Sequence, residues 1–371
     1  MNRLKHTFLF LLMLLVLPVA AFAAEHTEDS AKSEGALDAK EIIFEHLGDG
    51  YGWEVPFDHH HRIPLPVIVF GDGGFHCFSS ARISGGKTYT VDGVEYKVAG
   101  PDSPHKNKVV AIIDGKEYRP WDLSITKNVA ALWISVLVVC VILISLAQYH
   151  KKNGYKAPRK FLGAIEGLTD FIWNGAVKPI LGPNARKFAP YLLTVFWFIL
   201  VMNLLGLIVI FPGGANLTGN IAVTLVLATL TFLVTNIFAN RHYWKEIFWP
   251  EVPLMLKFPI PLMQIIEFFG MFTKPAALTV RLFANMLSGH MIVLVLTLLI
   301  FIFSATSPLA GGATTVVSVL FSLFMMLIDV LVSFIQAYVF TILSTLFIAL
   351  AQEHGHDAEH KEEERLKNLE L

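Results

Sequence analysis

The chain has 371 residues, of which 54% are hydrophobic and 16% are charged, and its mean hydropathy is +0.57. This composition is too apolar for an ordinary soluble enzyme and is typical of an integral membrane protein. The formal net charge of -1 provides no overall basic field for binding nucleic acid. The basic residues therefore matter through their positions, which set the membrane topology.

The N-terminus has the three regions of a secretory signal. Arg3 and Lys5 precede an apolar core, and an Ala-Phe-Ala sequence at 21–23 precedes a polar segment. We expect residues 1–23 to be a signal peptide that is cleaved after Ala23, which would place the mature N-terminus outside the cytoplasm. A retained transmembrane helix is the alternative, and the short apolar core argues against it.

Residues 24–127 are polar and are expected to form a small extracytoplasmic region that contains β-hairpins. Asp92-Gly93 and Asp114-Gly115 each lie between alternating runs, and this dipeptide favours a two-residue turn because both positions tolerate a positive φ. The sequence "DHHHR" at 58–62 raises the question of a metal site. Three consecutive histidines cannot all reach one ion from a strand or helix, so we expect a solvated loop near the membrane surface and no metal.

The first membrane span is predicted from residue 128 onward. Residues 128–149 are apolar over a length that crosses the roughly 30 Å hydrocarbon core as a helix. A basic cluster follows at 150–160, and the positive-inside rule places this cluster in the cytoplasm. Residues 160–187 mix apolar and basic positions with Gly and Pro, which predicts an interfacial helix on the cytoplasmic surface.

Two further spans are predicted at about residues 189–211 and 217–239, joined by the uncharged turn "PGGAN". The segment "NRHYWKEIFWPE" then supplies basic and aromatic residues of the kind found at a cytoplasmic interface. The turn is therefore expected outside and this segment inside.

The last two apolar stretches, residues 259–303 and 315–351, would each exceed about 50 Å as a continuous helix. Each either contains a hidden hairpin or forms one strongly tilted helix, and we prefer tilt because it satisfies the charges of every loop. The uncharged loop "SATSPLAGGAT" is then outside. We expect a membrane domain at 128–352, a cytoplasmic charged tail at 353–371, and an all-α polytopic fold with about five membrane helices.

Five ionisable residues lie in these last two stretches: Glu267, Lys274, Arg281, His290 and Asp329. Each costs a few kcal/mol in lipid, so each is expected to face protein or water. Steps of seven residues place the first three near one helical face. His290 follows Arg281 by nine residues, toward the outer end and on a different face.

Some of these polar residues have a purely structural interpretation. Side chains that hydrogen-bond across membrane helices contribute about 1 kcal/mol, and we favour this role for Asn285, Ser288 and Asn203. Lys274 can extend its ammonium group to the interface. Glu267 can pair with Lys274.

Arg281, His290 and Asp329 are not explained in this way. Arginine stays protonated, so it holds a fixed positive charge against a carboxylate in a low dielectric. Histidine and aspartate can titrate near neutrality when they are buried, as a proton relay requires. The last two helices therefore offer a charge barrier and a relay.

The sequences "ALTVRLFANMLSGH" and "FIQAYVFTILSTLFIALAQEH" resemble subunit a of the F-type rotary ATP synthase, over roughly residues 125–354. The resemblance implies that Arg281 is the essential arginine of the family, with Asn285 beside it and Gln336 opposite. In the family, an acidic residue and a histidine on the two tilted helices mark the proton-access path. The matching positions here hold His290 and Asp329, so the histidine and the carboxylate have exchanged helices.

Glu267 matches a polar position that lines the path in the family. The resemblance implies a non-catalytic, proton-translocating stator subunit that forms two offset half-channels against the c-ring, with Arg281 between them. Protons would enter through His290, Asp329 and Glu267. The implied partners are the c-ring, the peripheral-stalk b subunits and the lipid bilayer of a bacterial inner membrane, with the N-terminal region outside and the C-terminus cytoplasmic.

Other functions are less consistent with the sequence. The chain has no P-loop, so we expect it to bind no nucleotide and to need no cofactor. A membrane-embedded metal hydrolase would carry clustered ligands such as H-E-x-x-H within a span, and none occurs. An independent secondary transporter predicts internal repeats, and the two halves do not resemble each other.

Overall fold

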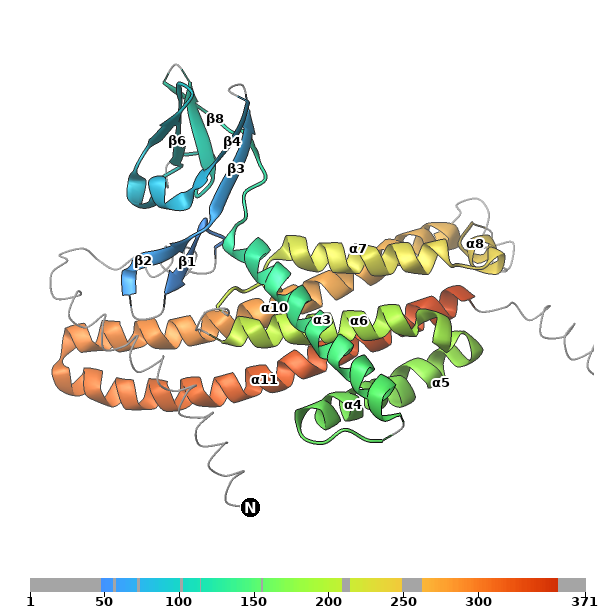
Figure 1. Ribbon diagram of the computed structural model, residues 1–371. Helices are drawn as coiled ribbons and strands as arrows, with labels where there is room; N and C mark the ends of the chain where they lie inside the picture. The colour runs from blue at the N-terminus through green and yellow to red at the C-terminus, as the bar shows by residue number, and fades with distance from the viewer. Residues whose placement is uncertain are drawn as a thin grey trace, which may run out of the picture. The chain divides into compact units, whose positions relative to one another are not determined.

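The computed structural model describes eight ranges of the chain (Figure 1): residues 48–55, 58–71, 74–100, 103–113, 115–154, 156–208, 214–248 and 262–352. The expected signal peptide, the tail at 353–371 and part of the "PGGAN" turn lie outside these ranges. The chain divides into two compact units. The first contains Met1–Leu137, Met202–Leu217 and Ser288–Val330, and the second contains Val138–Val201, Thr218–Leu287 and Leu331–Leu371.

In the first unit, the described residues ahead of the first long helix form antiparallel sheets with the strand orders β1-β2, β4-β3-β9 and β5-β6-β7-β8. The strands are β1 (Gly52–Val55), β2 (Asp58–Pro64), β3 (Pro66–Gly71), β4 (Gly74–Ser79), β5 (Tyr89–Val91), β6 (Val94–Val98), β7 (Val109–Ile113), β8 (Lys116–Tyr118) and β9 (Trp121–Asp122). The expected loop at 58–62 is therefore wrong. Its backbone pairs with β1, where Glu54 lies opposite Arg62.

Both predicted hairpins are confirmed by strand pairing. Asp92 and Gly93 join β5 to β6 with φ angles of 48° and 82°, as a two-residue turn requires. In the second hairpin, Ile113 of β7 pairs with Lys116 of β8, and Gly115 between them has a φ of 75°.

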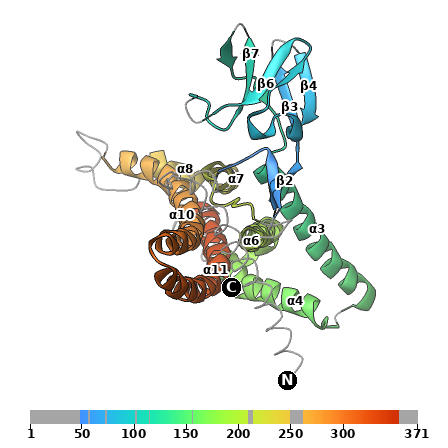
Figure 2. The same cartoon turned by 90° about the vertical axis from the view of Figure 1, so that its left-hand side faces the viewer.

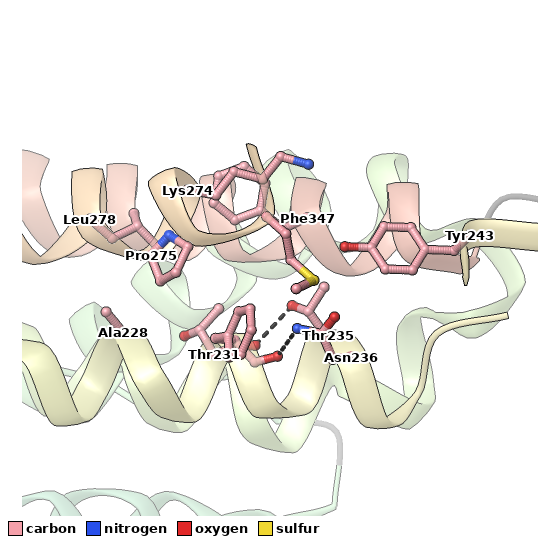
Figure 3. A pocket seen from close by; sticks show the side chains of 11 residues that line it. Ala228, Thr231, Thr235, Asn236, Tyr243, Lys274, Pro275, Leu278 and Phe347 are labelled. Atoms are coloured by element: carbon pink, nitrogen blue, oxygen red, sulfur yellow. Dashed lines mark hydrogen bonds between the residues drawn. The ribbon is translucent and has the colours of Figure 1, made fainter. Parts of the chain in front are cut away.

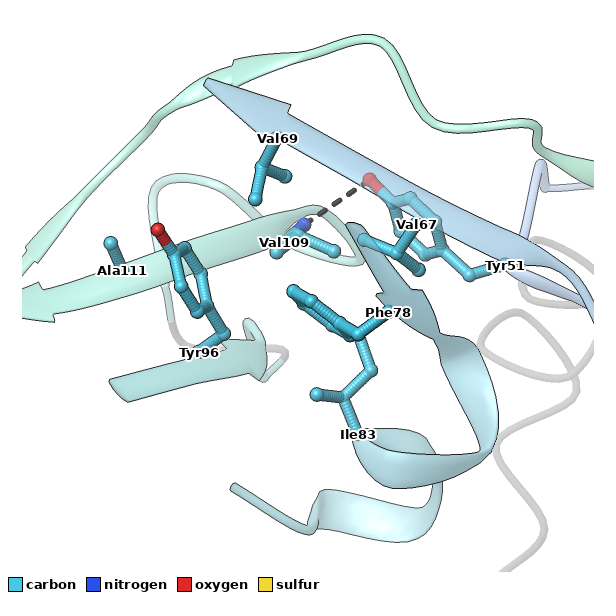
Figure 4. Close-up of a cluster of buried hydrophobic side chains, with 8 residues drawn as sticks. All are labelled: Tyr51, Val67, Val69, Phe78, Ile83, Tyr96, Val109 and Ala111. Carbon is cyan, nitrogen blue, oxygen red and sulfur yellow. Dashed lines mark hydrogen bonds between the residues drawn. The ribbon is translucent and has the colours of Figure 1, made fainter. Parts of the chain in front are cut away.

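The core of this β-region comes from strand alternation. Val67 and Val69 on β3 are fully buried, whereas Phe70 beside them is exposed. Figure 4 shows the inward side chains of β3 and β4 facing those of β6 and β7. The cluster consists of Tyr51, Val67, Val69, Phe78, Ile83, Tyr96, Val109 and Ala111. Two sheets thus share one apolar interior, as in a small sandwich.

The β-region is tied to the first turn of helix α3 (Lys127–Asn153). The backbone N–H of Lys127 donates to the Gly50 carbonyl at 2.8 Å, and that of Asn128 donates to Asp49 Oδ1 at 3.1 Å. These bonds satisfy N–H groups that a helix start leaves without a partner inside the helix. Tyr51 nearby donates its hydroxyl to Asp122. Burial raises the pKa of Tyr51, and the bond to Asp122 raises it further.

The remaining described elements are helical. They are α4 (Phe161–Ile172), a π-helical turn (Trp173–Val177), α5 (Lys178–Leu181), α6 (Ala185–Leu207), α7 (Ile221–Ile237), α8 (Arg241–Phe248), α10 (Leu262–Thr306) and α11 (Pro308–Gln352). Four helical segments are long and apolar enough to cross a membrane, namely Lys127–Asn153, Phe161–Leu207, Gln264–Ala305 and Gly311–Gln352, and α7 is a shorter apolar helix. The chain is a multi-pass membrane protein.

Helices α10 and α11 each run for 45 residues without a break, so the choice against hidden hairpins is confirmed. Both views show the two helices side by side (Figures 1 and 2). The expected extent of the loop, residues 304–314, is wrong, because Ser307 alone separates α10 from α11. Its outer position stays a prediction. Helical bonds continue on both sides of it: Ser307 N–H donates to Phe303 O at 3.3 Å, and Gly311 N–H donates to Ser307 O at 2.9 Å.

Polar contacts in the second unit hold the helix ends. Asn240, between α7 and α8, donates its side-chain Nδ2 to the Gln352 carbonyl at 2.6 Å and its backbone N–H to the Ala351 carbonyl at 2.8 Å. These two bonds satisfy carbonyls that the end of α11 leaves without helical partners. On α6, Tyr191 shares a 2.9 Å hydrogen bond with Thr231 of α7. The last turn of α11 is thereby fixed to the α7–α8 connection.

Candidate functional site

His290 of α10 contacts the end of α6 within the first unit. Its Nε2 lies 3.3 Å from the carbonyl oxygen of Gly206. A carbonyl only accepts hydrogen bonds, so this contact requires the proton on Nε2. Gly206 itself is buried.

Asp329 of α11 reaches the backbone of α10 one residue before His290. A Cβ atom added to Gly289 would lie 2.7 Å from Asp329 Oδ1 and 3.0 Å from its Cγ. The carboxylate therefore packs directly against the Cα of Gly289. Sequence analysis expected the histidine and the aspartate to meet as a pair. The structure brings Asp329 to the neighbouring residue, and the direct pairing stays a prediction.

Arg281 is exposed on α10 in the second unit. Among the described residues, it has no ion pair and no hydrogen bond with another part of the chain. An arginine cannot be neutralised by losing its proton in a protein. Arg281 therefore carries a permanent positive charge on an exposed part of α10.

Asn285 lies one turn after Arg281 and links α10 to α11. Its Nδ2 donates to Oε1 of Gln336 at 2.8 Å, and Gln336 is only 3% exposed. The expectation that Asn285 hydrogen-bonds across helices is confirmed, and the position of Gln336 opposite Arg281 stays a prediction. The bond fixes the rotation of α10 near Arg281 relative to this part of α11.

Glu267 and Lys274 occupy the first half of α10, and both are partly buried. The expected pair between them does not form among the described residues. Lys274 instead has its ammonium 5.7 Å from the ring centre of Phe347. Glu267 precedes His290 by 23 residues of one continuous helix, which is about 35 Å of rise, with Arg281 between them. This spacing argues against a shared route for Glu267, His290 and Asp329, which stays a prediction.

A small cavity with a mixed polar and apolar lining adjoins Lys274 within the second unit (Figure 3). Its volume is about 20 Å³, which suffices for one water molecule. Thr231, Thr235 and Asn236 of α7 contribute polar groups, and the hydroxyl of Tyr243 points toward the cavity. Oδ1 of Asn236 is buried without a hydrogen-bond partner among the described atoms.

Sequence reasoning missed three features of this region: Gly206, Gly289 and the cavity. A glycine beside a candidate relay histidine is visible in the letters "SGH", but which residue crowds it depends on the register of α11 against α10. The contact of Gly206 depends on a carbonyl, which no side-chain pattern reveals. The cavity is formed by α7, α8, α10 and α11, and its α11 residue lies about 100 residues or more after its α7 and α8 residues in the sequence.

Comparison with known proteins identifies the family. Residues 129–349 match the ATP synthase A chain family. The match covers more than half of the chain. This chain belongs to the ATP synthase A chain family. Residues 42–123 match a separate domain of unknown function (DUF8433), which coincides with the described β-region.

Relatives agree with this assignment. The chain is 43% identical over 247 residues to ATP synthase subunit a of Chlorobium phaeobacteroides, which covers 65% of this chain and 69% of the relative. The chain is 40% identical over 279 residues to ATP synthase subunit a of Chloroherpeton thalassium, which covers 73% of this chain and 78% of the relative. Identity to that of Anaeromyxobacter is 33% over 350 residues, covering 91% and 77%. The expectation of a non-catalytic ATP synthase subunit is confirmed.

Proposed function

We propose that this chain is the proton-translocating stator subunit of an F-type ATP synthase, in which Arg281 separates two offset half-channels against a c-ring. The observation that carries the proposal is the exposed Arg281, which has no counter-charge among the described residues. In an apolar setting such a charge needs a partner, and a carboxylate on a neighbouring subunit would provide it.

The arginine would act on that carboxylate by Coulomb attraction. A positive charge within about 4–6 Å favours the ionised form of a carboxylate and so promotes release of its proton. The same charge discourages a proton from passing straight between the two routes. Each proton driven through 100 mV supplies about 2.3 kcal/mol, so several protons support one nucleotide turnover elsewhere in the complex.

The two routes follow from positions along α10. His290 and Asp329 would form the uptake route on the outer side. Glu267 would belong to the release route on the cytoplasmic side, because it lies beyond Arg281. The cavity beside Lys274 supports the release route, since some of its lining residues offer hydrogen-bonding groups on the same part of α10 as Glu267.

The lengths of α10 and α11 support a wrapping role. A helix of 45 residues is about 68 Å long, more than twice the hydrocarbon core. To remain in the membrane, each helix would tilt by roughly 60° from the normal. Helices lying close to the membrane plane can follow a curved ring over much of their length. An upright bundle would touch it only at one point.

The remaining elements fit the expected topology. With α7 counted as a crossing, the chain has five membrane passages, with the β-region outside, α4 at the inner interface, and the C-terminus in the cytoplasm of a bacterial inner membrane. The break at Gly182, where φ is 52°, supports a separate interfacial segment ahead of α6. Lipid and the peripheral-stalk b subunits would cover surfaces that the ring leaves open.

The test replaces Arg281 by alanine in the assembled complex and measures ATP-driven proton pumping in inverted vesicles. We expect pumping to be lost, and Arg281→Lys to restore little of it, because the ammonium lacks the planar, bidentate geometry of the guanidinium. Val280→Ala, an exposed neighbour on the same helix, is the matched control and should keep pumping. Native pumping by the alanine variant would refute the role of Arg281.

A second measurement separates this function from an independent transporter. The purified chain alone should conduct no protons through vesicles, and conduction should require the c-ring. Stable transport by the isolated chain would favour the alternative.

A further inference from the structure

Gly289 is the most crowded glycine that faces an ionisable group among the described residues. All three nearest atoms to a Cβ built at this position belong to the Asp329 carboxyl group: Oδ1 at 2.7 Å, Cγ at 3.0 Å and Oδ2 at 3.0 Å. Gly289 is buried and lies inside α10, where a glycine costs about 1 kcal/mol relative to alanine. A helix-weakening residue at this position therefore has a packing cause.

Two other glycines on the same helix pair show what is specific about Gly289. Gly270, also inside α10, has no atom within 4 Å of an added Cβ. Gly311 is crowded too, but its neighbours are Oγ at 2.6 Å and Cα at 2.7 Å, both from Ser304, at the tight turn between the helices. Among the described glycines of α10 and α11, the crowding atoms are those of a carboxylate only at Gly289.

We propose that Gly289 is a positioning residue for proton uptake, whose missing side chain lets the Asp329 carboxylate lie against α10 beside His290. The inference rests on the proposed function. With any side chain at 289, the distance from its Cβ to Asp329 Oδ1 would have to grow from 2.7 Å to at least the 3.4 Å of an ordinary contact, a shift of about 0.7 Å. The carboxylate would leave its place beside the relay histidine.

The ionisable groups beside this contact are on the two long helices. In the parts of α10 and α11 that belong to the first unit, residues 288–306 and 308–330, the ionisable side chains are His290 and Asp329. Helix α6 contributes the Gly206 carbonyl to His290, and a carbonyl does not titrate. A change in the placement of Asp329 would therefore act on the histidine next to Gly289.

The experiment measures passive proton conduction through the assembled membrane sector, as a function of pH, for three variants. Gly289→Ala should slow conduction on the order of tenfold, since misplacing a reacting group by about 1 Å has costs of this size or larger. Its pH profile should also change shape, because the distance between Asp329 and His290 changes. Gly270→Ala should match the native chain in rate and profile.

Gly311→Ala provides the purely structural comparison. It perturbs a tight helix–helix contact that involves no ionisable group. Any loss of proton conduction should therefore be by the same factor at every pH. A Gly289→Ala variant that lost conduction in the same proportional way would overturn the positioning role, as would one with native conduction.

A second variant keeps the proposal testable if Gly289→Ala fails to assemble. Removing the crowding atoms with Asp329→Ala should relieve the clash, so Gly289→Ala/Asp329→Ala should reach the membrane as well as Asp329→Ala alone. Failure of this rescue would overturn the contact itself.

Asp329→Asn distinguishes the inference from the proposed function. If Asp329→Asn conducts normally, Asp329 has no part in uptake and the proposed route fails together with the inference. If Asp329→Asn is impaired while Gly289→Ala is native, the route stands and only the role of Gly289 is refuted.

Discussion

The hydrogen bond between Asn285 and Gln336 should couple the two long helices energetically. Replacing Asn285 by leucine removes the donor at 2.8 Å and leaves the Oε1 of Gln336, which is 3% exposed, without its partner. A buried acceptor without a partner costs about 1–3 kcal/mol. Gln336→Met should cost less, because it leaves only the exposed amide of Asn285 behind.

The double variant gives the size of the interaction itself. Hydrogen bonds between membrane helices contribute about 0.6 kcal/mol on average and up to about 1.7 kcal/mol. We expect the double variant to lose less stability than the two single variants combined, by an amount in this range. At 1.4 kcal/mol per factor of ten, this difference in free energy corresponds to a factor of about 3 to 20 in an equilibrium constant.

The assay is the rate at which ATP-driven proton pumping is lost on heating, measured for native, single and double variants at one temperature. Thr345→Val is the matched control, since its buried hydroxyl donates only within α11, to the Thr341 carbonyl at 2.7 Å. Its effect should simply add to that of Asn285→Leu. If the Asn285 and Gln336 effects also add, the hydrogen bond contributes no coupling and the reasoning fails.

Three further outcomes are expected. Exchanging the relay pair, as His290→Asp with Asp329→His, should restore part of the pumping lost in either single variant, and a double variant no better than the worse single would argue against a pair. Deleting residues 24–120 should leave passive proton conduction intact in assembled complexes, because this region supplies no group at membrane depth. Because the pKa of Tyr51 is raised in the folded chain, Tyr51 contributes fully to stability below about pH 10, and this contribution declines as the pH rises toward the folded pKa. Protection of the β-region from proteolysis in the full chain should therefore fall at alkaline pH. The fall should be smaller in Tyr51→Phe.

Local rules predicted the elements of this fold that depend on neighbouring residues. The Asp92-Gly93 turn follows from the backbone freedom of two residues, and α3 follows from a long apolar run with a basic end. The continuity of α10 was predictable from loop charge, even though Pro275 lies within it. Each of these features needs no knowledge of a distant partner.

Features that depend on tertiary register were not predictable in this way. His76 is 4% exposed, with Nδ1 2.9 Å from the Tyr96 hydroxyl and Nε2 3.2 Å from Asp92. Nothing in the sequence near His76 indicates these contacts, because strands β4 and β6 belong to different sheets. The grouping of Glu267 with His290 likewise rested on residue type, without the 23 residues of α10 that separate them.

The connection between α10 and α11 has a mechanical consequence. With Ser307 as the whole linker and helical bonds continuing on either side, this turn has no slack to take up strain. A rotor that pushes sideways on one helix would transmit the force directly to the other helix through this short, rigid turn. Lengthening the linker by a few glycines would make the turn flexible. Part of the energy of each rotary step would then be stored as elastic deformation of the stator instead of being delivered as torque.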